Sequence, residues 1–260
     1  MIAVYRLLYP WDFLWKSVES ITDYVERIYI FVDREPWGRV GLEPHEQKSV
    51  RQAMVTACNL AVENPKVIIM GDHVETPVNQ FTHLINNRVL PIDYKGTDGS
   101  VMVIEPDMVF RKDQVERAIR LASEHECCMT KQVEIWKGFR HRVPDRPHRT
   151  GVCFWKSRNI PKTLHQANVS GMPVIDAFVH NFGFSVSGET MRTKHTIAIR
   201  MSKNIGDCQP NVDWYEKKWL NWEPGMKDLE ISIGYEHDIP EVVPYPIEDL
   251  PKSIKRLVSE

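Results

Sequence analysis

Hydrophobic and polar positions follow two different periods along the first half of the chain. Short, nearly continuous apolar runs, typical of strands buried on both faces of a sheet, lie at 2–8, 27–33, 66–70 and 101–104. Segments whose apolar residues recur every three or four positions predict amphipathic helices at 13–25, 44–64, 76–90 and 111–125. Pro77 falls in the first turn of the third of these helices, where proline is favoured. Strands and helices are therefore predicted to alternate along this half.

The second half is less regular. Its predicted strands lie at 127–138, 151–157 and 176–187, and its predicted helices at 187–203 and 213–222. Ser187 is a candidate cap for the first of these helices. The alternation in the first half predicts an α/β fold with a mostly parallel central sheet and helices on both faces. Because neither a repeat nor a linker interrupts the chain, we expect a single domain over 1–260 with an elaborated carboxyl-terminal half.

The composition indicates the cellular compartment of the protein but leaves its binding partner open. The chain has 260 residues, 42% of them hydrophobic, and a formal net charge of −2, which argues against a surface built wholly for nucleic acid. Five cysteines contain no CxxC pair, so a reducing compartment is expected. The opening MIAVYRLLYPWDFLWKS has no basic leader, and no segment approaches the roughly 20 apolar residues of a membrane span. We therefore expect a cytoplasmic protein without a transmembrane segment.

Two acids end the apolar run VMVI. Glu105 and Asp107 are separated only by Pro106, which suits the end of a strand because it lacks a backbone donor. In an extended chain these two carboxylates point to the same side. Paired oxygen ligands at a sheet edge are what Mg²⁺ or Mn²⁺ requires, and such an ion neutralises a diphosphate. The alternative is a solvated turn whose acids favour the start of the next helix.

Several segments together resemble the glycosyltransferases of the GT-A fold, in particular the family-two-like enzymes that use nucleotide-sugar donors. These segments are IAVYRLLYPWDFLWKSVESI, RIYIFVD, NQFTHLINNRVL and VMVIEPDMVF. The last is similar to the family's Asp-X-Asp segment, with glutamate in the first place. The resemblance covers about the first 120 residues and extends weakly over the rest, where HNFGFSVSGETMRTKH, WYEKKWLNW and GYEHDIP are similar to divergent members. It implies a Rossmann-like sheet, a nucleotide-sugar-binding half over 1–112 and an acceptor-binding half over 113–260.

The resemblance also implies roles for individual residues. Asp33 would contact the base or ribose of the donor, and Asn79 or Asn86 would line the same pocket. The implied metal ligands for Mn²⁺ or Mg²⁺ on the donor diphosphate are Glu105, Asp107 and the late His237 of GYEHDIP. Asp176, in GMPVIDAFVHNFG, is the candidate general base that an inverting transfer needs.

The implied partners are a UDP- or GDP-sugar donor and a hydroxyl acceptor. The acceptor is left open among a glycan, a lipid-linked sugar, a protein and modified DNA bases. The sequence departs from the family where YPWD and REPWG replace an Asn-Glu pair and a Ser/Thr-rich turn. These departures leave the donor's identity open as well.

The segment 129–162 carries nine basic residues against only Glu134 and Asp145. It is expected to hold the leaving diphosphate, an anionic acceptor or DNA phosphates, or to be a solvated basic hairpin. A metal-dependent nuclease is the rival enzyme class. Such a site has an acid and a lysine separated by one residue on a strand, whereas two residues separate Glu134 from Lys137 in EIWK. A non-catalytic carbohydrate- or nucleic-acid-binding domain is the other alternative. The chain contains no GxxxxGK[ST], GxGxxG, GxSxG or HExxH motif, which disfavours kinase, dehydrogenase, hydrolase and zincin chemistry.

Overall fold

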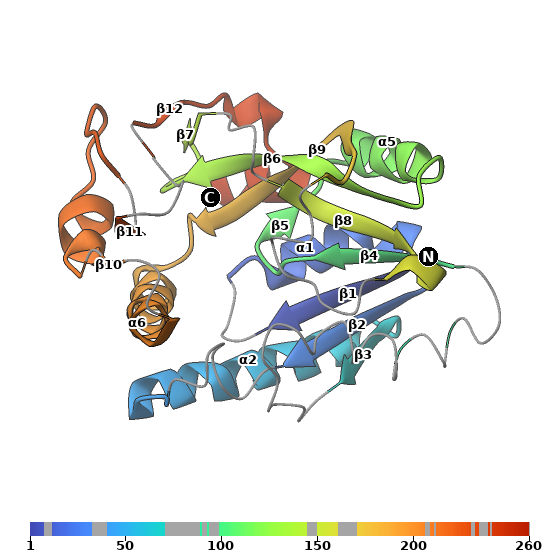
Figure 1. Ribbon diagram of the computed structural model, residues 1–260, viewed down its shortest axis with the longest axis horizontal. Coiled ribbons are helices and arrows are strands. Elements are labelled where there is room, and N and C mark those ends of the chain that lie inside the picture. The colour runs from blue at the N-terminus through green and yellow to red at the C-terminus, as the bar shows by residue number, and fades with distance from the viewer. Residues whose placement is uncertain are drawn as a thin grey trace.

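The structure is a computed structural model. It describes residues 1–7, 12–32, 41–70, 89, 93, 99–144, 150–160, 171–205, 209–210, 212–229, 232–233, 239 and 241–259. Within these ranges ten strands form one sheet, and β10 (Gln209–Pro210) pairs with β11 (Ser232–Ile233) in a separate ribbon. The α/β class predicted from the alternating periods is confirmed (Figure 1).

The core of the sheet is parallel. It is formed by β3 (Val67–Met70), β2 (Arg27–Val32), β1 (Ile2–Leu7) and β4 (Ser100–Ile104), in that spatial order. Beyond β4, β8 (Thr150–Lys156) runs antiparallel, followed by β6 (Cys127–Trp136), which is antiparallel to β8. Strands from both halves of the sequence therefore belong to the same sheet (Figure 1).

The far edge of the sheet brings later strands beside the turn that follows β4. Here β9 (Val174–Phe184) runs parallel to β6 and antiparallel to the short β5 (Met108–Val109). On the other side of β6, β7 (His141–Arg142) pairs with β12 (Val243–Pro244). The pairing of β5 with β9 joins chain positions more than 70 residues apart, Met108 lying opposite Asn181.

Alternate residues of the parallel strands face two different hydrophobic clusters. Ala3 and Tyr5 pack on the same face as α1 (Leu14–Ile21), α2 (Pro44–Glu63) and α5 (Lys112–Ala122). Ile2, Val4, Tyr29 and Phe31 point to the opposite face, where they meet Val89, Trp155 and Ile160. Burial on both faces explains why these strands are apolar at nearly every position instead of at every second one.

The predicted helices agree with the structure where it describes them. The segment 13–25 becomes α1 followed by a 3-10 turn (Thr22–Tyr24), and 111–125 becomes α5. The amino end of α2 is closed by a reciprocal capping box between Glu43 and Glu46. The helix predicted at 76–90 lies outside the described residues apart from Val89.

Tryptophans of the second half fill a hydrophobic cluster. The predicted helix at 213–222 is a π-helix (Tyr215–Leu220), and Trp136, Trp214 and Trp219 are all buried. Their neighbours satisfy two of the indole N–H groups: Trp214 donates to Leu229 O at 2.8 Å and Trp219 to Phe184 O at 2.9 Å. These three rings are therefore core residues and not exposed platforms for a sugar ring.

The long helix α6 (Gly188–Ile205) is anchored near both ends. At its start, Ser187 Oγ accepts the N–H of Thr190 at 3.2 Å, which confirms the predicted cap. Asp12, in the loop after β1, accepts the N–H of Ser187 and the hydroxyl of Thr190. Further along, Arg200 pairs with the buried Glu46 of α2. Both anchors tie α6 to the amino-terminal half.

The carboxyl-terminal elements complete the core. A 3-10 turn (Ile247–Asp249) leads into α7 (Lys252–Ser259), whose Ile254 is fully buried in the cluster that contains the tryptophans. A further 3-10 turn (Ser157–Asn159) follows β8. None of the helices in the described part of the chain combines the length and apolar composition that crossing a bilayer requires.

Candidate functional site

The acids that follow VMVI lie in a turn. β4 ends at Ile104, and the N–H of Met108 donates to Glu105 O at 3.1 Å, which closes the turn around Pro106. Glu105 is exposed, whereas Asp107 is only 2% exposed. The extended conformation predicted for residues 105–107 is therefore wrong. The chain must turn here because β5 leaves β4 to pair with β9.

Three polar side chains from different elements converge beside Gly183. A Cβ added to Gly183 would stand 2.7 Å from Asp107 Oδ2, 2.9 Å from Asn181 Oδ1 and 2.9 Å from Lys194 Nζ. Asn181 and Gly183 belong to β9, Lys194 to α6, and Asp107 to the turn before β5. We call these four residues the Asp107 cluster.

Backbone hydrogen bonds hold the Asp107 cluster in place. Asn181 Oδ1 accepts the N–H of Gly183 at 2.7 Å, and Lys194 Nζ donates to Gly183 O at 3.1 Å. The carbonyl of Asp107 accepts the N–H of Phe182 at 2.8 Å. One short stretch of β9 thus orients the amide of Asn181 and the ammonium of Lys194, and it holds the backbone of Asp107.

Burial and the neighbouring ammonium act on Asp107 in opposite directions. Burial raises the pKa of Asp107, and the positive charge of Lys194 partly offsets that rise. Asp107 Oδ1 is buried and has no hydrogen-bond partner among the described residues. Buried acceptors normally have a partner, so this oxygen is a candidate for contacting a ligand.

The cluster fits a metal ion only in part. Among the described residues, no group of three or more His, Cys, Asp or Glu side chains comes together as a metal site. Asp107 Oδ1 offers one hard oxygen. Mg²⁺ in substrate complexes commonly takes only one or two carboxylates and completes its shell with water and substrate phosphates. The described residues therefore offer one carboxylate oxygen for a divalent ion, and the binding of Mn²⁺ or Mg²⁺ stays a prediction from sequence.

Of the other predicted site residues, the structure describes only Glu105 and Asp176. Asp33, Asn79, Asn86 and His237 lie outside the described residues. Asp176 is exposed near the start of β9, and Asn181 lies five residues further along the same strand.

Asp176 is also held by two cations. Arg117 pairs with its carboxylate, and Lys131 Nζ lies 2.8 Å from Oδ1. The hydrogen bond from Lys131 and the charges of both cations hold the pKa of Asp176 below its usual value. The general-base role stays a prediction from sequence, and neither the position nor the pairing of this side chain supports it.

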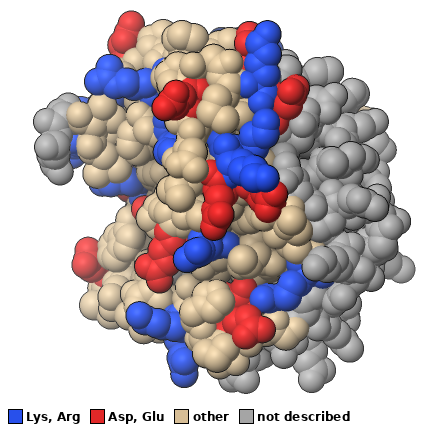
Figure 2. Space-filling model, turned by 90° about the vertical axis from the view of Figure 1, so that its left-hand side faces the viewer, with Lys and Arg blue, Asp and Glu red and all other residues tan. Residues whose placement is uncertain are grey.

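Three basic residues of the segment 129–162 are each bound by a different partner in the structure. Lys131 pairs with Asp176 and Arg158 with Glu126, while Lys137 Nζ donates to the carbonyls of Trp219 at 3.0 Å and Leu220 at 2.6 Å. Arg146, Arg149 and Lys162 lie outside the described residues. On the side of the molecule where β1 and β2 end, Lys and Arg are interspersed with Asp and Glu (Figure 2). These pairings favour the interpretation as a solvated hairpin.

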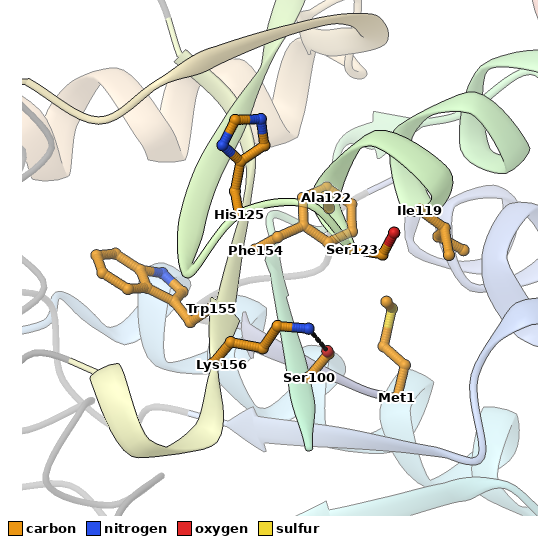
Figure 3. A pocket seen from close by; sticks show the side chains of 9 residues that line it. All are labelled: Met1, Ser100, Ile119, Ala122, Ser123, His125, Phe154, Trp155 and Lys156. Carbon is orange, nitrogen blue, oxygen red and sulfur yellow. Dashed lines mark hydrogen bonds between the residues drawn. The ribbon is translucent and has the colours of Figure 1, made fainter. Parts of the chain in front are cut away.

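A small cavity lies at the opposite edge of the sheet. Met1 and Ser100, at the amino ends of β1 and β4, line it together with Ile119, Phe154 and Lys156 (Figure 3). Its volume is about 70 Å³, far below the roughly 300 Å³ or more of ordinary ligand pockets. Because ligands of parallel α/β sheets bind beyond the carboxyl ends of the strands, the Asp107 cluster is the better candidate site.

Sequence analysis did not identify Lys194, Asn181 or Gly183 as site residues. One signal for Lys194 was present in the sequence. It lies three residues after Met191 and three before Ile197, both of which are buried, so a lysine occupies the buried face of a predicted helix. Lysine is rarely placed on such a face without a partner.

A substitution at Gly183 tests the geometry of the cluster. In Gly183→Ala the new methyl group would meet the Asp107 carboxylate, so we expect the free energy of unfolding to fall by about 1–3 kcal/mol and the cluster to be displaced. Urea denaturation measures the first effect. Gly41→Ala is the matched control, because a Cβ at Gly41 would meet nothing within 4 Å. Equal stability of both variants would show that the cluster is looser than described.

Comparisons with known proteins give only distant similarities. No protein-family model and no curated protein matches the sequence. The structure is similar to S. aureus TarS 1–349 with a TM-score of 0.40 and 11% identity, covering 77% of this chain and 65% of that one. It is similar to a 4-diphosphocytidyl-2C-methyl-D-erythritol synthase with a TM-score of 0.40, 9% identity and coverage of 77% and 98%. It is also similar to the inositol-1-phosphate CTP transferase from T. maritima, with a TM-score of 0.36 and 10% identity. That similarity covers 78% of this chain and 96% of the other.

The chain thus spans slightly less than two thirds of that TarS fragment. Similarities at this level assign no activity to the chain. The class that the structure itself defines is a mixed α/β protein whose central sheet is parallel at its core, with a polar cluster at the carboxyl edge of that core.

Proposed function

We propose that this chain is a metal-dependent glycosyltransferase that moves a sugar from a nucleotide-diphosphate donor to an acceptor hydroxyl. The observation that carries the proposal is the buried carboxylate of Asp107, whose Oδ1 has no partner among the described residues, just beyond the carboxyl end of the parallel strand β4. Open α/β sheets bind their ligands beyond this edge. The resemblance of VMVIEPDMVF to the family's Asp-X-Asp segment supports the same assignment.

The proposed roles follow from the chemistry of the side chains. Asp107 would hold Mn²⁺ or Mg²⁺ through Oδ1, and the exposed Glu105 would contact the same ion directly or through water. When bound, the ion supplies the positive charge that lets a nucleoside diphosphate depart. Asp33, Asn79, Asn86 and His237 keep the roles expected from the resemblance as proposals. No general base is assigned, because Asp176 is paired with Arg117 and Lys131.

The donor is proposed to be a UDP- or GDP-sugar, and the acceptor a hydroxyl of a glycan or another molecule, with anionic glycans and modified DNA included. The nuclease alternative is disfavoured by the contacts and burial of Glu134 and Lys137 in EIWK. Glu134 is buried in β6, and Lys137 is used to cap the carbonyls at the end of the π-helix. The non-catalytic alternative differs in that it predicts no metal-dependent affinity for nucleotides.

Calorimetric titration of UDP and GDP with and without manganese tests the proposed function. We expect one of the two nucleotides to bind, with an affinity at least about tenfold higher when manganese is present, because the ion links Asp107 to the diphosphate. The sugar conjugates of that nucleotide would then identify the donor. Absence of binding by either nucleotide under both conditions would reject the glycosyltransferase and leave the binding module.

A further inference from the structure

We propose that Lys194 is a second contact for the donor's diphosphate and that, without nucleotide, its ammonium opposes the binding of a metal ion at Asp107. This inference rests on the proposed function, and it adds a residue that the resemblance does not supply. It predicts that removing the charge of Lys194 strengthens the binding of metal alone and weakens the binding of the nucleotide.

The position of Lys194 directs its ammonium to the edge of the sheet where the diphosphate is proposed to bind. Its Nζ lies 2.9 Å from the point where a Cβ on Gly183 would stand, and Asp107 Oδ2 lies 2.7 Å from the same point. Nζ donates to Gly183 O at 3.1 Å and lies 5.6 Å from the centre of the Phe184 ring. The ammonium and the Asp107 carboxylate therefore lie at the same point of the cluster.

The helix that carries Lys194 is fixed on both sides of this residue. Four residues earlier, the Thr190 hydroxyl donates to Asp12 at 3.1 Å. Two residues later, the Thr196 hydroxyl donates to Glu46 at 3.0 Å, and Arg200 binds the same carboxylate. A charge held in this way loses little conformational freedom when a ligand arrives, which increases its contribution to binding.

The absence of a side chain at Gly183 is part of the arrangement. Any Cβ there would approach the Asp107 carboxylate, the Asn181 amide and the Lys194 ammonium to less than 3 Å. Because position 183 is glycine, the two opposite charges share this space without displacement of either side chain. The unpartnered Asp107 Oδ1 beside them is a second, independent sign that the cluster receives a ligand.

Electrostatics then gives Lys194 two opposite effects. In the free protein, a divalent ion on Asp107 would lie close to the ammonium of Lys194. Two positive charges in direct proximity repel strongly in a partly buried site. When a diphosphate is present, its oxygens accept hydrogen bonds from Lys194 and neutralise both positive charges. Lys194 should therefore weaken the binding of metal alone and strengthen the binding of the nucleotide diphosphate.

The test measures both ligands on the full chain. Lys194→Met keeps most of the aliphatic stem and removes the charge, and Lys112→Met makes the same change at an exposed position in the first turn of α5. Free Mn²⁺ is followed by its electron paramagnetic resonance signal, and the nucleotide that wild type binds is titrated calorimetrically at saturating manganese. For Lys194→Met we expect Mn²⁺ alone to bind about threefold more tightly or better. The nucleotide should bind roughly ten- to a hundredfold more weakly, while Lys112→Met matches wild type.

Lys194→Gln serves if Lys194→Met does not fold, because it keeps a polar N–H donor in the side chain while the charge is removed. Lys194→Arg, which keeps the charge, should retain nucleotide affinity to within about a few-fold. Nucleotide affinity of Lys194→Met or Lys194→Gln equal to that of wild type would overturn the role of Lys194 and leave the glycosyltransferase proposal standing. A wild type that binds no nucleotide would overturn both.

Discussion

Asp107→Asn is expected to weaken the binding of the donor nucleotide in the presence of manganese by at least about a hundredfold. The substitution keeps the shape of the side chain and replaces the carboxylate with an amide, which is a much poorer ligand for a hard cation. It also removes the counter-charge of Lys194 inside the cluster. Loss of residues that only support a metal ligand already costs about 10- to 100-fold, so loss of the ligand itself should cost more.

Stability should respond much less to Asp107→Asn than binding does. Because burial opposes the charged form of Asp107, the neutral asparagine avoids that desolvation. The charge left behind is that of Lys194, which is only partly buried and can be hydrated, so we expect the free energy of unfolding to change by no more than about 1 kcal/mol. Titration calorimetry and urea denaturation on the same preparation separate the two effects. Asp113→Asn makes the same chemical change on the exposed first turn of α5 and should alter neither nucleotide affinity nor the free energy of unfolding. Nucleotide affinity within threefold of wild type would remove Asp107 from the proposed site.

The second large effect is expected from Arg200→Met, which should lower the free energy of unfolding by about 3 kcal/mol or more. The Glu46 side chain is completely buried, and its carboxylate is bound by Arg200, the Thr196 hydroxyl and the N–H of Glu43. Removing the guanidinium leaves a buried negative charge with only neutral donors. Because this ion pair connects α2 to α6, its loss should also weaken the nucleotide binding that depends on Lys194.

An exposed ion pair provides the matched control for Arg200→Met. Arg158 pairs with Glu126 at 2.8 Å, and both side chains are more than half exposed. Arg158→Met should therefore change the free energy of unfolding by less than about 1 kcal/mol. Urea denaturation at neutral pH measures both variants. Equal losses in the two would mean that the Glu46–Arg200 pair contributes no more than a surface contact.

The same pair makes stability depend on acid pH. Burial alone would raise the pKa of Glu46, but the hydrogen bonds from Arg200, the Glu43 N–H and Thr196 outweigh it and hold this pKa below its usual value. A carboxyl group with a depressed pKa in the folded state stabilises the protein above its unfolded-state pKa of about 4.3, and this contribution is lost as the pH falls further. The difference in unfolding free energy between wild type and Glu46→Gln should therefore shrink below about pH 4.3.

The sequence by itself determined most of the helices and strands and one of the two charged residues of the site, Asp107. Apolar runs and amphipathic periods located β1 to β4, α1, α2, α5 and α6, because burial against a sheet demands those periods whatever the partners are. The acids after VMVI were visible for the same reason, since a buried strand cannot continue through Glu105, Pro106 and Asp107.

Only the tertiary structure decided which side chains meet. Asp107 reaches Asn181 and Gly183 because β5 pairs with β9, and it reaches Lys194 because α6 is anchored to Asp12 and Glu46. These contacts join positions more than 70 residues apart, and local periodicity carries no information about which distant segments pair. The basic segment is the converse case. The sequence left this segment open between an anion-binding role and a solvated hairpin. In the described ranges, Lys131, Arg158 and Lys137 each have a different partner, which favours the hairpin.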